Sequence, residues 1–149
     1  MKADNIITYY IDGNNLIGKI PELKKIKDNS AREKLIYSLQ RFFKDKKAKV
    51  IVFFDGFPSE RINSSFEIVY SLNKKADEVI KKRIDGSFKN KNLIVVSSDL
   101  EIYSYSKICG CKAIKSEDFF DIMISSKIDI NQEKPDRFNV EEYKKLFEL

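Results

Sequence analysis

The stretch YYIDGNNLIG, residues 9–18, indicates how the fold begins. An apolar run ends at Asp12 and is followed by Gly13 and two asparagines, after which apolar residues return. This pattern is typical of a buried strand that stops and turns directly into another element. A lone carboxylate at the end of a buried strand has several explanations, so its role depends on the partners that the rest of the chain supplies.

Short runs rich in β-branched and aromatic residues predict the strands of the fold. Each run is bounded by polar or turn residues, as expected of buried strands. The predicted strands cover residues 5–11, 49–54, 66–71, 93–97 and, more weakly, 112–115.

Helical patterns lie between these strands. The clearest begins at Ser30, because Ser30 and Glu33 have the spacing of a capping box and an apolar stripe follows. Further helices are expected over residues 74–84, 100–109, 117–126 and 139–148. Strands that alternate with helices imply right-handed crossovers, so we predict a single α/β domain over residues 1–149, a three-layer α/β/α sandwich with a mainly parallel sheet.

The composition is that of a globular protein, with 149 residues of which 42% are hydrophobic and 34% are charged. No apolar run approaches the roughly 18 residues expected of a membrane helix, so we expect no membrane partner. The opening residues MKADNIITYY have no stretch like the apolar region of a signal peptide. We therefore expect a cytoplasmic protein.

The absence of histidine limits the chemistry that the chain can perform. It excludes Ser-His-Asp and Cys-His catalysis, and it excludes a complete zinc site of the usual Cys/His kind within one chain. The two cysteines, Cys109 and Cys111, are too few for a disulfide framework, and we expect buried, inert thiols. Any hydrolysis therefore has to rest on carboxylates, lysines or a metal ion.

The net charge of +5 arises from several short lysine-rich stretches. Solvated helix faces explain each stretch equally well when it is taken alone. Their sum favours a polyanion such as nucleic acid as the partner.

Acidic residues recur at the strand ends. Asp12, Asp55 and Asp99 each end or follow a predicted strand, and Asp77 opens the helix of residues 74–84. In a parallel sheet the carboxyl ends of the strands meet at one edge, which is where such folds place their sites. Each Asp alone could cap a helix or shape a turn, a contribution of about 1 kcal/mol.

Together, these four carboxylates favour a cation site. Two carboxylates about 4 Å apart repel by roughly 4 kcal/mol at an effective dielectric constant near 20, and capping gives no reason for such crowding. Mg²⁺ or Mn²⁺ would reverse the sign of this energy, because both ions prefer oxygen ligands. A bound ion could activate water for displacement at phosphorus.

The sequence gives weaker evidence for the roles of the residues next to these acids. We prefer Asp77 to Glu78 as a ligand, because Glu78 lies four residues before Lys82 and is expected to form a solvated ion pair. Gly13 would allow the backbone to approach an ion or substrate, although helix entry alone could also require it. Asn15 could hold a carboxylate or a ligand through its amide, or help to start a helix.

Four segments together resemble a known family: YYIDGNNLIG, VIVFFDG, VYSLNKKADEVIKKRI and VVSSDLEI, in this order and spacing. They are similar to the NYN-domain, YacP-like proteins, relatives of the PIN-domain ribonucleases, and the likeness extends over residues 5–120. The family's basic C-terminal tail is short here, because the chain ends in EEYKKLFEL. The resemblance implies a PIN-like/NYN fold and a metal-dependent endoribonuclease that acts on single-stranded or loop RNA.

The resemblance also assigns roles to residues. Asp12 and Asn15 match the first motif, Asp77 matches the acid at the helix start, Asp99 the last strand-end acid, and Asp55 the second strand-end Asp. We therefore expect Asp12, Asp77 and Asp99 to be catalytic and, with Asp55, to bind Mg²⁺ or Mn²⁺. The residues expected to contact substrate are Asn15, Ser98, Lys74 and Lys75.

RNA, either mRNA or another single-stranded RNA, is the expected partner, and the ribosome is a further candidate. The alternative from another class is a non-catalytic RNA-binding or ribosome-associated factor, whose binding would depend on salt but not on Mg²⁺. A phosphatase with an Asp nucleophile is disfavoured, because DGNN lacks the second acid two residues after Asp12 that such enzymes use.

Overall fold

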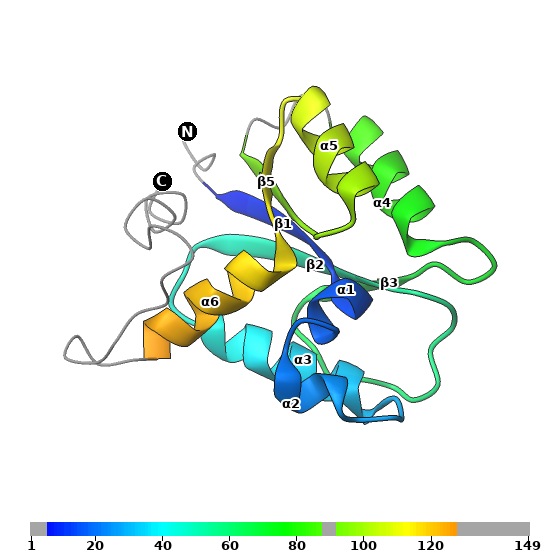
Figure 1. Ribbon diagram of the computed structural model, residues 1–149, viewed down its shortest axis with the longest axis vertical. Coiled ribbons are helices and arrows are strands. Elements are labelled where there is room, and N and C mark those ends of the chain that lie inside the picture. Colours follow the sequence, from blue (N-terminus) through cyan, green and yellow to red (C-terminus); the bar gives the residue numbers. More distant parts are fainter. Residues whose placement is uncertain (1–5, 88–91, 128–149) are drawn as a thin grey trace.

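The structure is a computed structural model that describes residues 6–87 and 92–127 (Figure 1). Its helices and strands alternate along the chain, as predicted, and the predicted helix over residues 139–148 lies outside the described residues. In chain order the elements are β1 (Ile7–Asp12), α1 (Gly13–Ile17), α2 (Pro21–Lys24), α3 (Ser30–Phe42), β2 (Ala48–Phe54), β3 (Glu67–Tyr70), α4 (Ala76–Asp85), β4 (Leu93–Val96), α5 (Leu100–Ile108), β5 (Lys112–Ile114) and α6 (Ser116–Lys127).

The five strands form one sheet in the order β3-β2-β1-β4-β5, and every pairing is parallel. The chain builds outward from β1 through β2 to β3, then returns to the other side of β1 for β4 and β5. The connections therefore leave β1 and β4 in opposite directions, which opens a crevice at the carboxyl ends of these two strands. The predicted α/β class and parallel sheet are confirmed.

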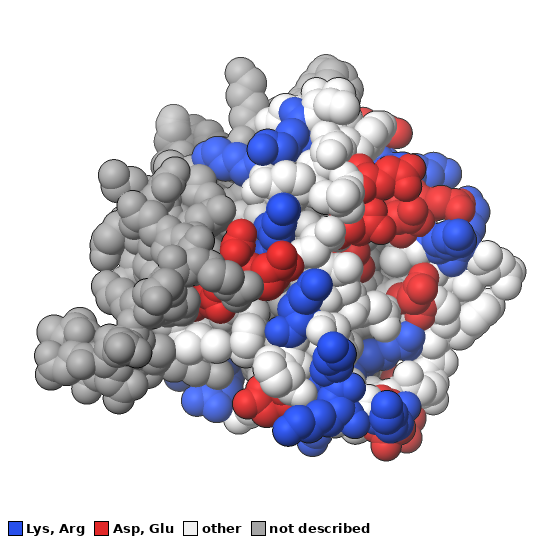
Figure 2. All heavy atoms as spheres, in the orientation of Figure 1, with Lys and Arg blue, Asp and Glu red and all other residues white. Residues whose placement is uncertain are grey.

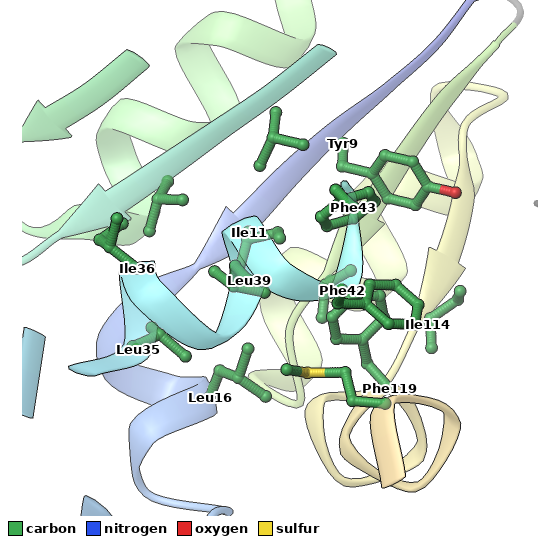
Figure 3. Packing of buried hydrophobic residues seen from close by; sticks show 14 of the residues in the cluster. Tyr9, Ile11, Leu16, Leu35, Ile36, Leu39, Phe42, Phe43, Ile114 and Phe119 are labelled. Atoms are coloured by element: carbon green, nitrogen blue, oxygen red, sulfur yellow. The ribbon is translucent and has the colours of Figure 1, made fainter. Parts of the chain in front are cut away.

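Helices cover both faces of the sheet, which gives three layers (Figure 1). Alternate residues of β1 point to opposite faces: Tyr9 and Ile11 join the larger apolar cluster, whereas Tyr10 joins the smaller one. The larger cluster contains residues of α1, α3 and α6, and Figure 3 shows Phe119 of α6 beside Phe42 at the end of α3. The smaller cluster contains residues of α4 and α5. Each fully buried large apolar side chain contributes roughly 1.5–3 kcal/mol, so these clusters fix the strand ends in place.

Two local predictions are wrong. Ser30 is not the N-cap of α3 but its first residue, and its hydroxyl donates to Asp28 Oδ1 at 2.5 Å instead of completing a capping box with Glu33. Glu78 makes no ion pair with Lys82; the ion pairs in the described part of the chain are Lys81–Glu101 and Arg83–Glu67.

Gly13 is required by packing between α1 and the end of β2. A Cβ atom at this position would lie 2.5 Å from Phe54 Cε1 and 2.8 Å from the Phe53 carbonyl oxygen, well inside contact distance. The glycine therefore allows α1 to begin against β2, and neither an ion nor a substrate is needed to explain it. This close approach holds the ends of β1 and β2, and so Asp12 and Asp55, next to each other.

The cysteines lie at the turn between α5 and β5. Cys109 and Cys111 are free and only half-buried, rather than buried as predicted, and both pack against the smaller apolar cluster. Burial raises the pKa of the Cys111 thiol. No helix within residues 6–87 and 92–127 has the length and apolar character needed to span a bilayer.

Candidate active site

Four predicted acids meet at the carboxyl edge of the sheet. Asp12 ends β1, Asp55 follows β2, Asp99 follows β4, and Asp77 is the second residue of α4. All four line one open hollow of about 510 Å³. The other residues that line it are Asn14, Asn15, Lys75, Ala76 and Ile102.

Asp12 is the most buried of these acids, with 6% of its surface exposed. Its Oδ2 accepts a hydrogen bond from the Ser97 hydroxyl at 2.8 Å. Burial raises the pKa of Asp12 to about 6, and the nearby carboxylates of Asp99 and Asp55 add to the rise, whereas Ser97 and the backbone N–H of Asn15 oppose it. The position therefore favours a proton or a cation beside the carboxylate.

Asp77 has a buried oxygen that lacks a partner. Its Oδ1 has no hydrogen bond among the residues that the structure describes, although it is shielded from solvent. An unsatisfied buried acceptor costs about 1–3 kcal/mol, and more when it is charged. A cation in the hollow would remove this cost.

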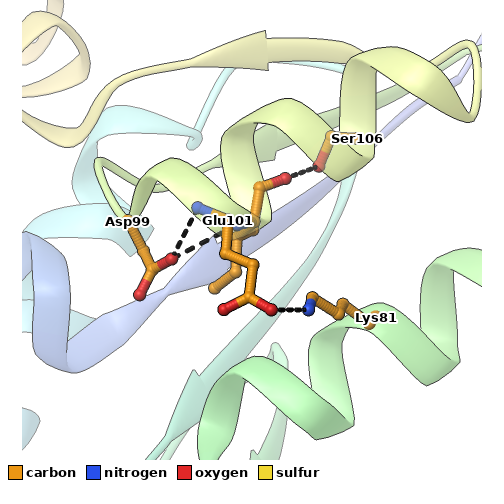
Figure 4. A network of polar contacts seen from close by, with 5 residues as sticks. Lys81, Asp99, Glu101 and Ser106 are labelled. Carbon is orange, nitrogen blue, oxygen red and sulfur yellow. Dashed lines mark hydrogen bonds and ion pairs between the residues drawn. The ribbon is translucent and has the colours of Figure 1, made fainter.

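Asp99 and Asp55 also fix helix starts. Asp99 Oδ1 caps α5 by accepting from the backbone N–H groups of Glu101 at 2.9 Å and Ile102 at 3.3 Å (Figure 4). Asp55 Oδ1 accepts from the backbone N–H of Ala76 at 3.0 Å, which holds the start of α4. In both side chains Oδ1 therefore has the structural role of holding a helix start. Oδ2 of each makes no hydrogen bond within the described ranges.

An ion pair joins α4, which carries Asp77, to α5, which Asp99 caps. Lys81 Nζ of α4 lies 2.6 Å from Glu101 Oε2 of α5 (Figure 4). The bond to Glu101, with the more distant Asp77 and Asp99, raises the pKa of Lys81. Figure 2 shows acidic side chains gathered on the α4 and α5 side of this face, with basic side chains along the α2 and α3 end.

Asn15 and Ser98 take part in a network behind the hollow. Asn15 Oδ1 accepts from Ser98 N at 2.9 Å and from the Ser116 hydroxyl at 2.7 Å. The Ser98 hydroxyl donates to Glu117 and accepts from Ser116 N. The network joins the start of α1 to the β4–α5 turn and to α6, so the observed contacts of both residues are structural, and substrate contact stays a prediction.

The two predicted lysines differ in position. Lys75 lines the hollow, whereas Lys74 is exposed but does not line it.

Two residues that the sequence did not indicate hold the Asp55 backbone. Asn14 Oδ1 accepts from Asp55 N at 2.7 Å. Arg32 of α3 donates from Nη2 to the Asp55 carbonyl at 2.6 Å and from Nη1 to the Phe57 carbonyl at 3.1 Å, while its guanidinium lies over the Phe54 ring. The first asparagine of DGNN could have suggested Asn14, whereas nothing distinguishes Arg32 among 28 basic residues.

The donor set fits a hydrated divalent cation. Within the described part of the chain, no group of three or more Cys, Asp or Glu side chains is arranged to hold one metal ion. Mg²⁺ is usually held by one or two carboxylates and several waters, so a hydrated ion does not need three carboxylates around it. The unsatisfied Asp77 oxygen and the raised pKa of Asp12 are both consistent with a cation. Shared binding by Asp12, Asp77 and Asp99 stays a prediction.

Comparisons with known proteins agree with this architecture. The family model described as YacP-like NYN domain matches residues 9–147. The uncharacterized protein YacP of Bacillus subtilis (strain 168) is 36% identical over 81 residues, which cover 48% of this chain and 48% of that protein. The match thus spans about half the length of this relative.

Crystal structures of Rae1 (YacP) from Bacillus subtilis are also similar. A tryptophan-to-leucine variant superposes with a TM-score of 0.67 at 25% identity, covering 82% of this chain and 77% of that one. A second structure gives a TM-score of 0.68 at 24% identity, covering 82% and 76%. The predicted fold and the predicted family are confirmed.

Proposed function

The chain belongs to the YacP-like NYN domain family, and on this premise we propose that it is a metal-dependent endoribonuclease that cleaves single-stranded or loop RNA. NYN domains are part of the PIN-like nuclease superfamily, so membership suggests a ribonuclease-type function. The main evidence for metal-dependent cleavage is that four carboxylates line one hollow, where Asp77 has a buried oxygen without a hydrogen bond among the described residues.

The proposed roles follow from the positions of the side chains. Asp12, Asp77 and Asp99 would hold Mg²⁺ or Mn²⁺, with Asp55 as a further ligand, each ion contacting one or two of them. When bound, such an ion activates water and stabilises the charge that develops at phosphorus. Lys75 would attract the phosphate at the rim.

Backbone contacts would keep the carboxylates in place during the reaction. Asp55 is held through its N–H by Asn14 and through its carbonyl by Arg32. Asp99 is held because it caps α5. Such preorganisation reduces the cost of bringing water and phosphate together.

Cleavage of labelled RNAs by the purified chain tests this function. A mixture of single-stranded and hairpin RNAs is incubated with Mg²⁺, Mn²⁺ or EDTA. We expect cleavage only with metal, and loss of at least a hundredfold in Asp77→Asn. Glu78→Gln is the matched control, because it alters the adjacent, exposed acid and should cleave like the wild type. Full activity in EDTA or in Asp77→Asn would overturn the assignment.

Metal binding provides a second readout that needs no activity. Titration calorimetry with Mn²⁺ should give heat for the wild type and for Glu78→Gln, and much weaker binding for Asp77→Asn. Equal Mn²⁺ affinities in all three proteins would remove Asp77 from the ligand set.

The competing proposal is a non-catalytic RNA-binding or ribosome-associated factor. It is supported by the net charge of +5 and by the structural roles of Asp55 and Asp99. It predicts RNA or ribosome binding that weakens with salt but is unchanged by EDTA. Salt-sensitive binding with no cleavage, on free RNA and on ribosomes programmed with mRNA, would favour this factor.

A further inference from the structure

Two large apolar side chains are exposed on the connections that carry the acids. Phe57 is 57% exposed and lies on the β2–β3 connection, two residues after Asp55. Leu72 is 50% exposed and lies on the β3–α4 connection, five residues before Asp77. Single exposed apolar residues are ordinary, but two on adjoining connections beside a polar hollow need an explanation.

Hydrogen bonds fasten the two connections to each other. Leu72 N donates to the Gly56 carbonyl at 2.8 Å, and Gly56 N donates to the Ser71 hydroxyl at 2.8 Å. Arg32 holds the Phe57 carbonyl. Figure 1 shows both connections leaving the same end of the sheet. The backbones of Phe57 and Leu72 are therefore fixed with respect to each other and to Asp55.

Leu72 has an unusual backbone conformation. Its φ angle is 61°, and it is the only residue other than glycine with a positive φ in the described part of the chain. The left-handed region is disfavoured for a bulky side chain such as that of leucine. Residues kept in such conformations are often found at ligand sites, where the surrounding contacts hold them.

Cations follow directly along the same connection. Lys74 and Lys75 are exposed, and Lys75 lines the acidic hollow. From Leu72 to Asp77 the chain thus carries one large apolar side chain, then two lysines, then one carboxylate. Single-stranded nucleic acid has the complementary chemistry, because its bases stack on aromatic and apolar side chains while its phosphates pair with cations.

We propose that Phe57 and Leu72 form a stacking ledge that binds an unpaired nucleobase next to the phosphate in the acidic hollow. The inference deepens the proposed function and rests on it. A base within a duplex is covered on both faces by its neighbours, so the ledge would select RNA that is unpaired beside the cleavage position. The occupant is one nucleobase of single-stranded RNA.

RNA binding measured without cleavage tests the ledge. The full chain carrying Asp77→Asn is titrated against single-stranded RNA with a fluorescent 2-aminopurine base. Stacking is worth roughly 1–3 kcal/mol per base, so adding Phe57→Ala should weaken binding about tenfold and reduce the fluorescence quenching. Phe57→Trp should restore both. Tyr37→Ala is the matched control, because Tyr37 is an aromatic residue 59% exposed on α3, and it should change neither.

The outcomes separate the ledge from the catalytic proposal. Loss in Phe57→Ala with rescue by Phe57→Trp supports the ledge even if the wild type cleaves no RNA, and the catalytic proposal alone would then fail. Unchanged binding and quenching in a folded Phe57→Ala protein would overturn the ledge, even if the wild type cleaves. An equal loss of affinity for a blunt RNA duplex, or no RNA binding by the wild type, would also overturn it.

Discussion

Replacing Asp12 with asparagine should stabilise the protein at neutral pH. Asp12 is buried, and its pKa is raised from 3.8 to about 6, so the fold disfavours the charged side chain. Below about pH 4 the carboxyl is protonated in both folded and unfolded chains and carries no penalty. The penalty grows as the pH rises toward 6 and is complete above it.

The size of the effect follows from this difference. A rise of about two units in the pKa of Asp12 corresponds to about 3 kcal/mol. This value is the upper limit for the free-energy cost of burying the charged side chain at pH 7. The side-chain amide of the Asp12→Asn variant would carry no charge and would keep one oxygen that accepts from the Ser97 hydroxyl. It would accept less well from the backbone N–H of Asn15, so the gain in stability should be below this limit. For a chain of this size, about 3 kcal/mol raises the melting temperature by roughly 6–12 °C.

The assay is thermal and urea unfolding from pH 4 to pH 8 in EDTA. We expect similar stabilities of Asp12→Asn and wild type at pH 4, and a gap that widens to pH 6 and is constant above pH 7. Mg²⁺ or Mn²⁺ should narrow the gap by stabilising the wild type alone. Asp45→Asn, an exposed site at the α3–β2 turn, should change stability by less than about 0.5 kcal/mol. A variant less stable than the wild type at pH 7 in EDTA would refute the burial penalty.

Three other variants follow from the structure. Gly13→Ala should destabilise the protein by about 1–3 kcal/mol in urea unfolding, because its Cβ would collide with the Phe54 ring. An unchanged free energy of unfolding would mean that α1 can move away from β2 without cost. Asp99→Ser should keep the α5 cap and nearly all stability but lose metal-dependent cleavage, whereas Asp99→Ala should also lose about 1 kcal/mol; cleavage by Asp99→Ser would exclude a metal role. Arg32→Ala should release the Asp55 and Phe57 carbonyls and so lower both the RNA affinity, measured by titration, and the cleavage rate, measured as initial rates. An unchanged affinity and rate would show that the β2–β3 connection is held in place without Arg32.

Regular elements and strand-end acids were predictable because they are local patterns. The five strands and the helices that became α3 to α6 were placed to within about two residues, since each shows a clear period or boundary. The bounds of α1 and α2 were not predicted, because segments of five and four residues are too short to display a helical period, although a helix start after Asp12 was one of the alternatives.

Long-range contacts could not be predicted from one sequence. The bond between Arg32 and the Asp55 carbonyl joins residues 23 apart, and no local signal marks either partner. Asp77 is half-buried and lines the hollow, whereas Glu78 is exposed, which is consistent with the preference for Asp77, although its role as a ligand stays a prediction. The different positions of Lys74 and Lys75 depend on how the connection enters α4.

The network around Asn15 sets the order in which the hollow can be completed during synthesis. Asn15 lies at the start of the first helix, yet its side chain accepts from Ser98 and from Ser116, which is 101 residues later in the chain. A growing chain is synthesised at about 5–20 residues per second, so Asn15 emerges several seconds before Ser98 and Ser116 do. If the acidic hollow cuts RNA, a nascent chain would carry all four carboxylates before it holds them in place, and cleavage would begin only once the start of α6 has docked.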